Sequence, residues 1–136
     1  MKREAQMIEA IGLEDLLARV EQQKAAGDRL VAISCAVVEG ANEITYSFED
    51  RAHRFLHLRI TVPPGATIPS VTPSYWGAFV YENEIHDLYG LTVTGMNVDF
   101  GGHFYATKVP YPFAAAATPK VTPAGKEAQE KECLDR

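Results

Sequence analysis

The chain has 136 residues, of which 46% are hydrophobic and 23% charged, and its formal net charge at pH 7 is −5. This length and composition suit one domain with its own hydrophobic core. Because the charge is negative and the lysine and arginine residues are scattered, no cationic surface for phosphates is expected, which argues against nucleic acid as a partner.

The first half of the chain alternates between helical and strand-like patterns. Apolar residues recur at helical spacing from Leu13 to Ala26, which predicts an amphipathic helix. A β-branched apolar run at 30–38, a glycine turn and the alternating sequence 44–48 predict a hairpin. Alternation resumes at 53–62, so a third antiparallel strand is expected to complete a meander.

The second half is predicted to contain one helix and an irregular segment. Thr72 suits the cap position and a proline follows it, so the helix is expected to span Pro73–Tyr89. Leu91 and Val93 form a candidate short fourth strand. The glycine-, proline- and aromatic-rich sequence up to residue 113 lacks periodicity and predicts an irregular C-terminal segment. The expected fold class is therefore α+β.

The expected domain boundary follows residue 113. Residues 1–113 are predicted to form a single α+β domain, and 114–136, poor in large apolar residues, to form a tail that is flexible or ordered by a partner. Cys35 and Cys133 lack metal or redox spacing and are expected to be free thiols in a reducing compartment. No window approaches the ~20 apolar residues that cross a bilayer, so membrane contact is expected only through another subunit.

The predicted second helix carries acids where a helix disfavours them. Glu84 and Asp87 share a face with Trp76, whereas Tyr81 and Ile85 form an apolar stripe on the opposite side, so both sides are expected to be covered. Glu84 and Asp87 are like charges at i, i+3, and Asp87 lies near the negative end of the helix dipole. Something outside the helix must offset these terms. The candidates are backbone N–H groups or Arg51, Arg54 and Arg59.

Three interpretations of the acids remain open: a solvated helix end, a buried or partner-facing set of charges, or chemistry. A small metal-dependent or acid/base enzyme would use Glu82, Glu84, His86 and His103. The chain has no HExxH motif, and Glu84 projects away from the Glu82 and His86 face, which argues against a metal site. No serine or cysteine carries a nucleophile motif, so no catalytic residue is assigned.

The stretch WGAFVYENEIHDLYGLTVTG, residues 76–95, resembles the signature of the 30 kDa subunit family of complex I, the respiratory NADH-quinone oxidoreductase. The spacing Glu-x-Glu-x-x-Asp-x-x-Gly is intact. The matching positions are Trp76, Tyr81, Glu82, Glu84, Asp87, Leu88, Tyr89, Gly90 and Leu91. Asn83 stands where the family usually has arginine. The short length of the chain and its departures from the family pattern look more like the small subunit of Ech-type or CO-induced energy-converting nickel-iron hydrogenases.

The resemblance covers about residues 10–113 and implies a hydrophilic-arm subunit that carries no cofactor and is not an enzyme on its own. Its implied partners are the large subunit, of nickel-iron or 49 kDa type, and iron-sulfur subunits, which would hold the nickel-iron centre and the clusters. Such a subunit would be cytoplasmic and peripheral to the membrane. The hydrogenase branch is the first expectation, and the 30 kDa subunit of NADH-quinone oxidoreductase is the alternative.

The same resemblance implies where the chain would meet its partner. The second helix and the glycine-rich segment after it are expected to dock on the large subunit. The expected interface residues are Trp76, Glu82, Asn83, Glu84, Asp87, Tyr89, Gly90, Gly102 and His103.

Overall fold

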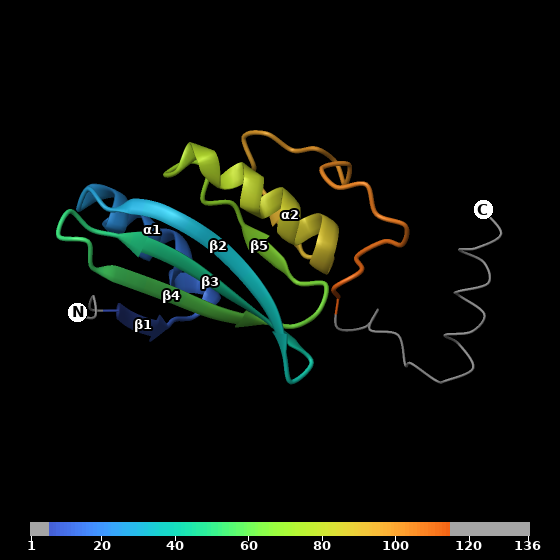
Figure 1. Cartoon of the computed structure of the whole chain (residues 1–136), viewed down its shortest axis with the longest axis horizontal. Helices are drawn as coiled ribbons and strands as arrows, with labels where there is room; N and C mark the ends of the chain where they lie inside the picture. The colour runs from blue at the N-terminus through green and yellow to red at the C-terminus, as the bar shows by residue number, and fades with distance from the viewer. Residues whose placement is uncertain (1–5, 115–136) are drawn as a thin grey trace.

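A computed structural model describes residues 6–114, which form a mixed sheet covered on one face by two helices (Figure 1). The α+β class expected from the sequence is confirmed. The strands of the sheet are β1 (Gln6–Ala10), β2 (Arg29–Val38), β3 (Ala41–Glu49) and β4 (Phe55–Val62), in the order β1-β4-β3-β2. The helices are α1 (Leu16–Ala25), after a 3-10 turn at Leu13–Asp15, and α2 (Phe79–Tyr89), after a 3-10 turn at Trp76–Ala78. A separate parallel pair is made by β5 (Thr67–Pro69) and β6 (Thr92–Thr94).

The predicted meander is present as β2, β3 and β4, paired antiparallel throughout. Glu39 and Gly40 connect β2 to β3 with φ of 51° and 78°. Positive φ at both turn residues matches the right-handed twist of a hairpin, and glycine takes one of these positions without steric cost. The alternation predicted for β4 is also confirmed, since Leu58 and Ile60 are buried while Arg59 between them is partly exposed.

Two strands were missing from the sequence prediction. β1 pairs with β4 in parallel, which turns the expected three-stranded meander into a four-stranded mixed sheet. Met7 and Ile8 of this edge strand are 59% and 57% exposed, so it lacks the half-buried alternation that indicates a strand. β5 is three residues long and is defined by its pairing with β6, which contains the anticipated Val93.

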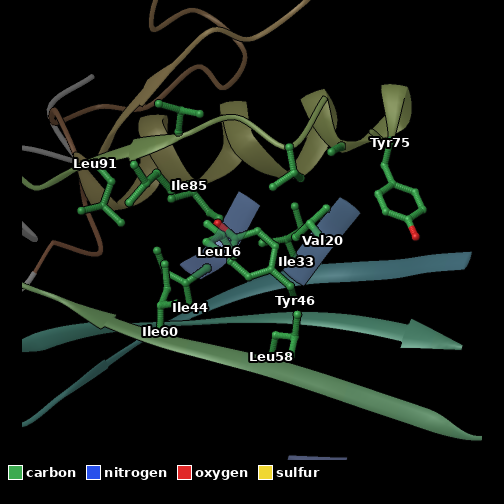
Figure 2. Close-up of a cluster of buried hydrophobic side chains, with 14 of the residues drawn as sticks. Leu16, Val20, Ile33, Ile44, Tyr46, Leu58, Ile60, Tyr75, Ile85 and Leu91 are labelled. Carbon is green, nitrogen blue, oxygen red and sulfur yellow. The ribbon is translucent and has the colours of Figure 1, made fainter. Parts of the chain in front are cut away.

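The core lies between the sheet and the two helices. Figure 2 shows Ile44, Tyr46, Leu58 and Ile60 pointing from the strands towards the helices. The buried apolar set is Leu16, Val20, Ile33, Ile44, Tyr46, Phe48, Leu58, Ile60, Val62, Ile68, Val71, Tyr75, Ala78, Ile85, Leu91 and Val93. Because β3, β4, α1 and α2 all contribute, the orientation of α2 is fixed by this core.

The start of α2 differs from the prediction, while its end agrees. Thr72 does not cap the helix, because its hydroxyl hydrogen-bonds to the Ser70 hydroxyl (2.7 Å) and accepts the Asn97 N–H (3.2 Å). Regular helix begins only at Phe79. Gly90 ends it at φ 76°, with its N–H donating to the His86 carbonyl, as the glycine position indicates.

Two further predictions concern the chain as a whole. No helix within residues 6–114 is long and apolar enough to cross a membrane. The predicted tail falls, apart from Ala114, on residues 115–136, which lie outside the described part of the chain.

Candidate functional site

Helix α2 lies between the sheet and the C-terminal segment 95–114, as its two-sided pattern predicts (Figure 1). On the sheet side, Ile85 is buried in the core and the Tyr81 hydroxyl donates to the Val31 carbonyl (3.1 Å). The Tyr89 hydroxyl donates to the Cys35 carbonyl at 2.8 Å. The polar stripe of the helix therefore faces the 95–114 segment, and its side chains determine how that segment is held.

Glu82 is fully buried and binds the loop that precedes the helix. Its carboxyl accepts hydrogen bonds from the Ser70 hydroxyl (2.7 Å) and from the Val71 N–H (3.1 Å). Burial raises the pKa of Glu82 from 4.5 to about 7, and the two hydrogen bonds to the ionised form oppose part of that rise. A carboxyl with this pKa is close to half protonated at neutral pH.

Asn83 is 1% exposed and makes three hydrogen bonds. Its amide nitrogen donates to the carbonyls of Phe79 (2.7 Å) and Val98 (2.9 Å), and its amide oxygen accepts the Phe100 N–H (3.0 Å). An amide can donate and accept at once, whereas an arginine offers donors only. Asn83 can therefore bind both a carbonyl and an N–H of the 95–114 segment.

Asp87 holds the same segment one turn later. It is 5% exposed, and its Oδ2 accepts the Tyr105 N–H at 2.8 Å while its Oδ1 lies 2.8 Å from His86 Nδ1. The contact with His86 joins two side chains that are neighbours in the sequence. Of the two acids for which an outside partner was expected, Asp87 receives a backbone N–H, from Tyr105, and Glu84 receives the Tyr105 hydroxyl.

The alternative prediction, that arginines supply the counter-charge of these acids, is wrong. Arg54 pairs with Asp50 at 2.8 Å, and Arg59 pairs with Glu43 at 3.2 Å. Arg51 is exposed and its guanidinium lies beside Gly27. The physical reason is the alternation of β4, which turns its arginine to the face of the sheet opposite the helices.

A cavity of about 660 Å³ lies between the C-terminal half of α2 and the 95–114 segment. Its lining includes His86, Asp87, Asp99, Gly102, Lys108 and Tyr111. At its edge Gly90 meets the Tyr111 ring so closely that an added Cβ would lie 3.0 Å from that ring. Gly90 therefore serves both the left-handed helix end and a close contact with the segment.

Three of the four residues of the enzyme interpretation bind different partners, and the fourth is exposed. Glu82 binds the Ser70 loop, Glu84 accepts a hydrogen bond from the Tyr105 hydroxyl (3.2 Å), and His86 bonds to its neighbour Asp87. The His103 side chain is exposed on the segment. Within residues 6–114, no three histidine, cysteine, aspartate or glutamate side chains gather closely enough to hold a metal ion.

A row of aromatic rings on the outer side of α2 was not anticipated, except for Trp76. Ring centroids follow one another from Trp76 to Phe79 (5.0 Å), from Phe79 to Phe100 (6.4 Å), from Phe100 to Phe104 (5.0 Å) and from Phe104 to Tyr105 (5.2 Å). We call these five residues the aromatic row. The phenylalanines and tyrosine of 100–105 were visible in the sequence, but without periodicity nothing placed them against the helix.

These features define a class: an α+β domain in which an acidic helix organises an irregular C-terminal segment and exposes aromatic side chains beside it. The chain belongs to the family of the 30 kDa subunit of respiratory-chain NADH dehydrogenase, whose sequence model matches residues 7–100. The family resemblance inferred from the helix motif is confirmed.

The fold is also similar to a chain in the structure of the membrane-bound sulfane sulfur reductase, an archaeal respiratory membrane complex. The TM-score is 0.77 at 16% sequence identity, over 95% of this chain and 81% of the other. No curated protein matches the chain in sequence.

Proposed function

We propose that the chain is a non-catalytic subunit of a membrane-bound oxidoreductase complex related to the energy-converting nickel-iron hydrogenases. It docks on the large subunit through α2 and the 95–114 segment. The observation that carries the proposal is the aromatic row, with Trp76 65% and Phe100 42% exposed on the same side of α2. Exposed aromatic side chains in mutual contact are typical of protein interfaces. Two findings support this assignment: the membership of the family, and the similar fold of one chain in the archaeal membrane complex.

In this proposal the chain carries no cofactor. The polar side chains of α2 are engaged within the chain, with Glu82, Asn83 and Asp87 all hydrogen-bonded to its own backbone. The nickel-iron centre and iron-sulfur clusters belong to the large and iron-sulfur subunits. The chain is held at the cytoplasmic face of the membrane by those partners.

The structure divides the proposed interface residues by burial. Glu82, Asn83 and Asp87 are at most 5% exposed. Asn83 and Asp87 contribute by shaping the 95–114 segment, and Glu82 by holding the loop before the helix. Trp76 and Glu84 lie on the outer side of α2 and contact the partner directly. The remaining interface residues, at the end of the helix and on the segment, are Tyr89, Gly90, Gly102 and His103.

The 30 kDa subunit of NADH-quinone oxidoreductase is the second candidate, because the matching family is named for the NADH dehydrogenase of the respiratory chain. Purification of the complex distinguishes the hydrogenase assignment from the NADH-quinone oxidoreductase assignment. A tagged full-length chain extracted from membranes in mild detergent is expected to bring a large subunit at a one-to-one ratio together with nickel. A large subunit without nickel would favour the quinone branch. Recovery of the chain alone, away from membranes, would refute the docking proposal.

The Asp87→Ala variant tests the indirect role of the buried acids. Removing the carboxylate frees the Tyr105 N–H and loosens the docking surface, so recovery of the large subunit is expected to fall about tenfold. Asp15→Ala, at an exposed aspartate before α1, is the matched control and should assemble normally. If Asp87→Ala assembles at the wild-type level and only turnover falls, Asp87 has no part in docking.

A further inference from the structure

The chemistry of the docking surface indicates what covers it. Val80 and Glu84 of α2 follow Trp76, in the 3-10 turn before the helix, at intervals of four residues. From the segment, Phe100 contacts Phe79 and Tyr105 contacts Glu84. Val80 and Tyr105 are 39% and 41% exposed. Exposed aromatic rings in mutual contact are unfavourable in water and are typical of protein interfaces.

The charged side chain in contact with this row is negative. Glu84 Oε2 accepts a hydrogen bond from the Tyr105 hydroxyl at 3.2 Å, so a carboxylate lies at one end of the aromatic row. Its charge raises the pKa of the Tyr105 hydroxyl. Asp99, directly before Phe100 in the sequence, is a second exposed carboxylate, and it lines the cavity together with Lys108. The faces of aromatic rings also carry negative potential, so rings and carboxylates together attract a cation.

Arginine is the protein cation that fits both features. Its planar guanidinium stacks on aromatic faces and can bind a carboxylate through two N–H groups, whereas a lysine ammonium is a strongly hydrated point charge. Glu84 uses Oε2 for Tyr105, and no described contact occupies its Oε1. A guanidinium lying on the aromatic row can therefore donate to Glu84 without displacing Tyr105.

The same charges weigh against other occupants. A second copy of the chain would bring its own Glu84 and Asp99 to the contact, and the whole chain has a net charge of −5. An anionic membrane surface would be repelled for the same reason. A protein with a basic side chain at the centre of an apolar patch is the complementary partner.

We infer that the large subunit places an arginine on the aromatic row, within hydrogen-bond reach of Glu84. This inference rests on the proposed function and adds the chemistry of the contact. The most direct test replaces Val80 of the tagged full-length chain with a photo-crosslinking phenylalanine analogue, in the native membranes. Crosslinks are expected on the large subunit beside an arginine, and the peptide identifies that residue.

Charge reversal then tests the pair. Glu84→Arg is expected to reduce recovery of the large subunit about tenfold or more, because it sets two cations against each other in the contact. Changing the crosslinked arginine to glutamate should restore recovery. Glu21→Arg, at an exposed glutamate of α1, introduces the same charge elsewhere and should have no effect.

A second variant guards against a folding defect. Glu84→Gln keeps an acceptor for the Tyr105 hydroxyl but removes the charge, so recovery should fall by less than with arginine and become insensitive to salt. If wild type recovers the large subunit and Glu84→Arg does so equally, the inference is wrong and the proposed function stands. Crosslinks to a second copy or to lipid would also overturn it. If wild type recovers no large subunit, the proposed function itself fails.

Discussion

The sheet and the 95–114 segment are held in place by different forces. In β3, every second side chain from Ile44 to Phe48 is fully buried against the helices, and ladders of hydrogen bonds run to both neighbouring strands. Residues 95–114 contain no helix or strand in the described structure. They are attached to α2 by the buried side chains of Asn83 and Asp87 and by contacts between aromatic rings.

Because of this difference, the stability of the domain and the conformation of the 95–114 segment depend on different residues. Burial of apolar area is shared among many residues of the sheet, so damage there lowers the stability of the whole domain. Attachment through a few hydrogen bonds can be lost locally while the sheet stays folded. The surface proposed to meet the partner is thus built on the part of the chain that is easiest to loosen.

The largest expected effect comes from the sheet. Phe48 is fully buried and its ring lies 5.6 Å from that of Tyr75, so Phe48→Ala should lower the free energy of unfolding by about 3–5 kcal/mol. Urea unfolding followed by circular dichroism measures the change. Val37→Ala, on a side chain of β2 that is 39% exposed, is the control and should cost less than about 1 kcal/mol. Equal losses in the two variants would contradict a core centred on β3.

The next effect is a pH dependence that originates at Glu82. Its pKa is about 7 in the folded chain and near 4.5 when unfolded, so the folded state binds the proton more tightly. This contribution to stability is fully present below about pH 4.5 and is lost as the pH rises through 7, to a total of about 3 kcal/mol. Urea midpoints measured between pH 5 and pH 8 should therefore fall.

Glu82→Gln is the matched variant for this prediction. The amide oxygen can accept the Val71 N–H and the amide nitrogen can donate to Ser70 Oγ, so the loop keeps both contacts without a titratable group. Stability in this pH range should then change less than in wild type, and at pH 8 the variant should be the more stable protein. An unchanged pH profile would show that Glu82 does not control it.

Much of the fold was predictable because apolar residues with a fixed period must be buried on one face. This holds for β3, β4 and α1. β2 was predicted instead from its run of β-branched apolar residues, and the end of α2 from Gly90, which takes the left-handed conformation there. β1 and β5 could not be predicted in this way. They are short, β1 is exposed, and both are defined by pairing with strands distant in the sequence, which local periodicity does not report.

At the candidate site, the sequence predicted that the acids need a partner but did not identify that partner. Acids at Glu84 and Asp87 require something outside the helix, and the burial of Asp87 confirms that a partner was needed. Which partner could not be deduced, because the Tyr105 N–H lies 18 residues further along an aperiodic segment. In the sequence, Asn83 is notable only because it stands in place of a positively charged residue. The positions of Val98 and Phe100 reveal that its amide both donates and accepts hydrogen bonds.

Asn83→Ala is expected to change the stability of the whole domain least. Its main effect is expected on the opening of the 95–114 segment. It leaves the Phe100 N–H and the Val98 carbonyl without their partner, so the free energy of opening the 95–114 segment should fall by about 1–3 kcal/mol. In hydrogen exchange, the Phe100 and Tyr105 amides should exchange about 10- to 100-fold faster while the amides of β3 keep their rates. His103→Ala is the control, because that side chain lies on the same segment, is exposed and makes no hydrogen bond within residues 6–114. If the β3 amides accelerate as much as Phe100 does, the segment and the sheet unfold as one unit, and the separation of stability from docking shape is wrong.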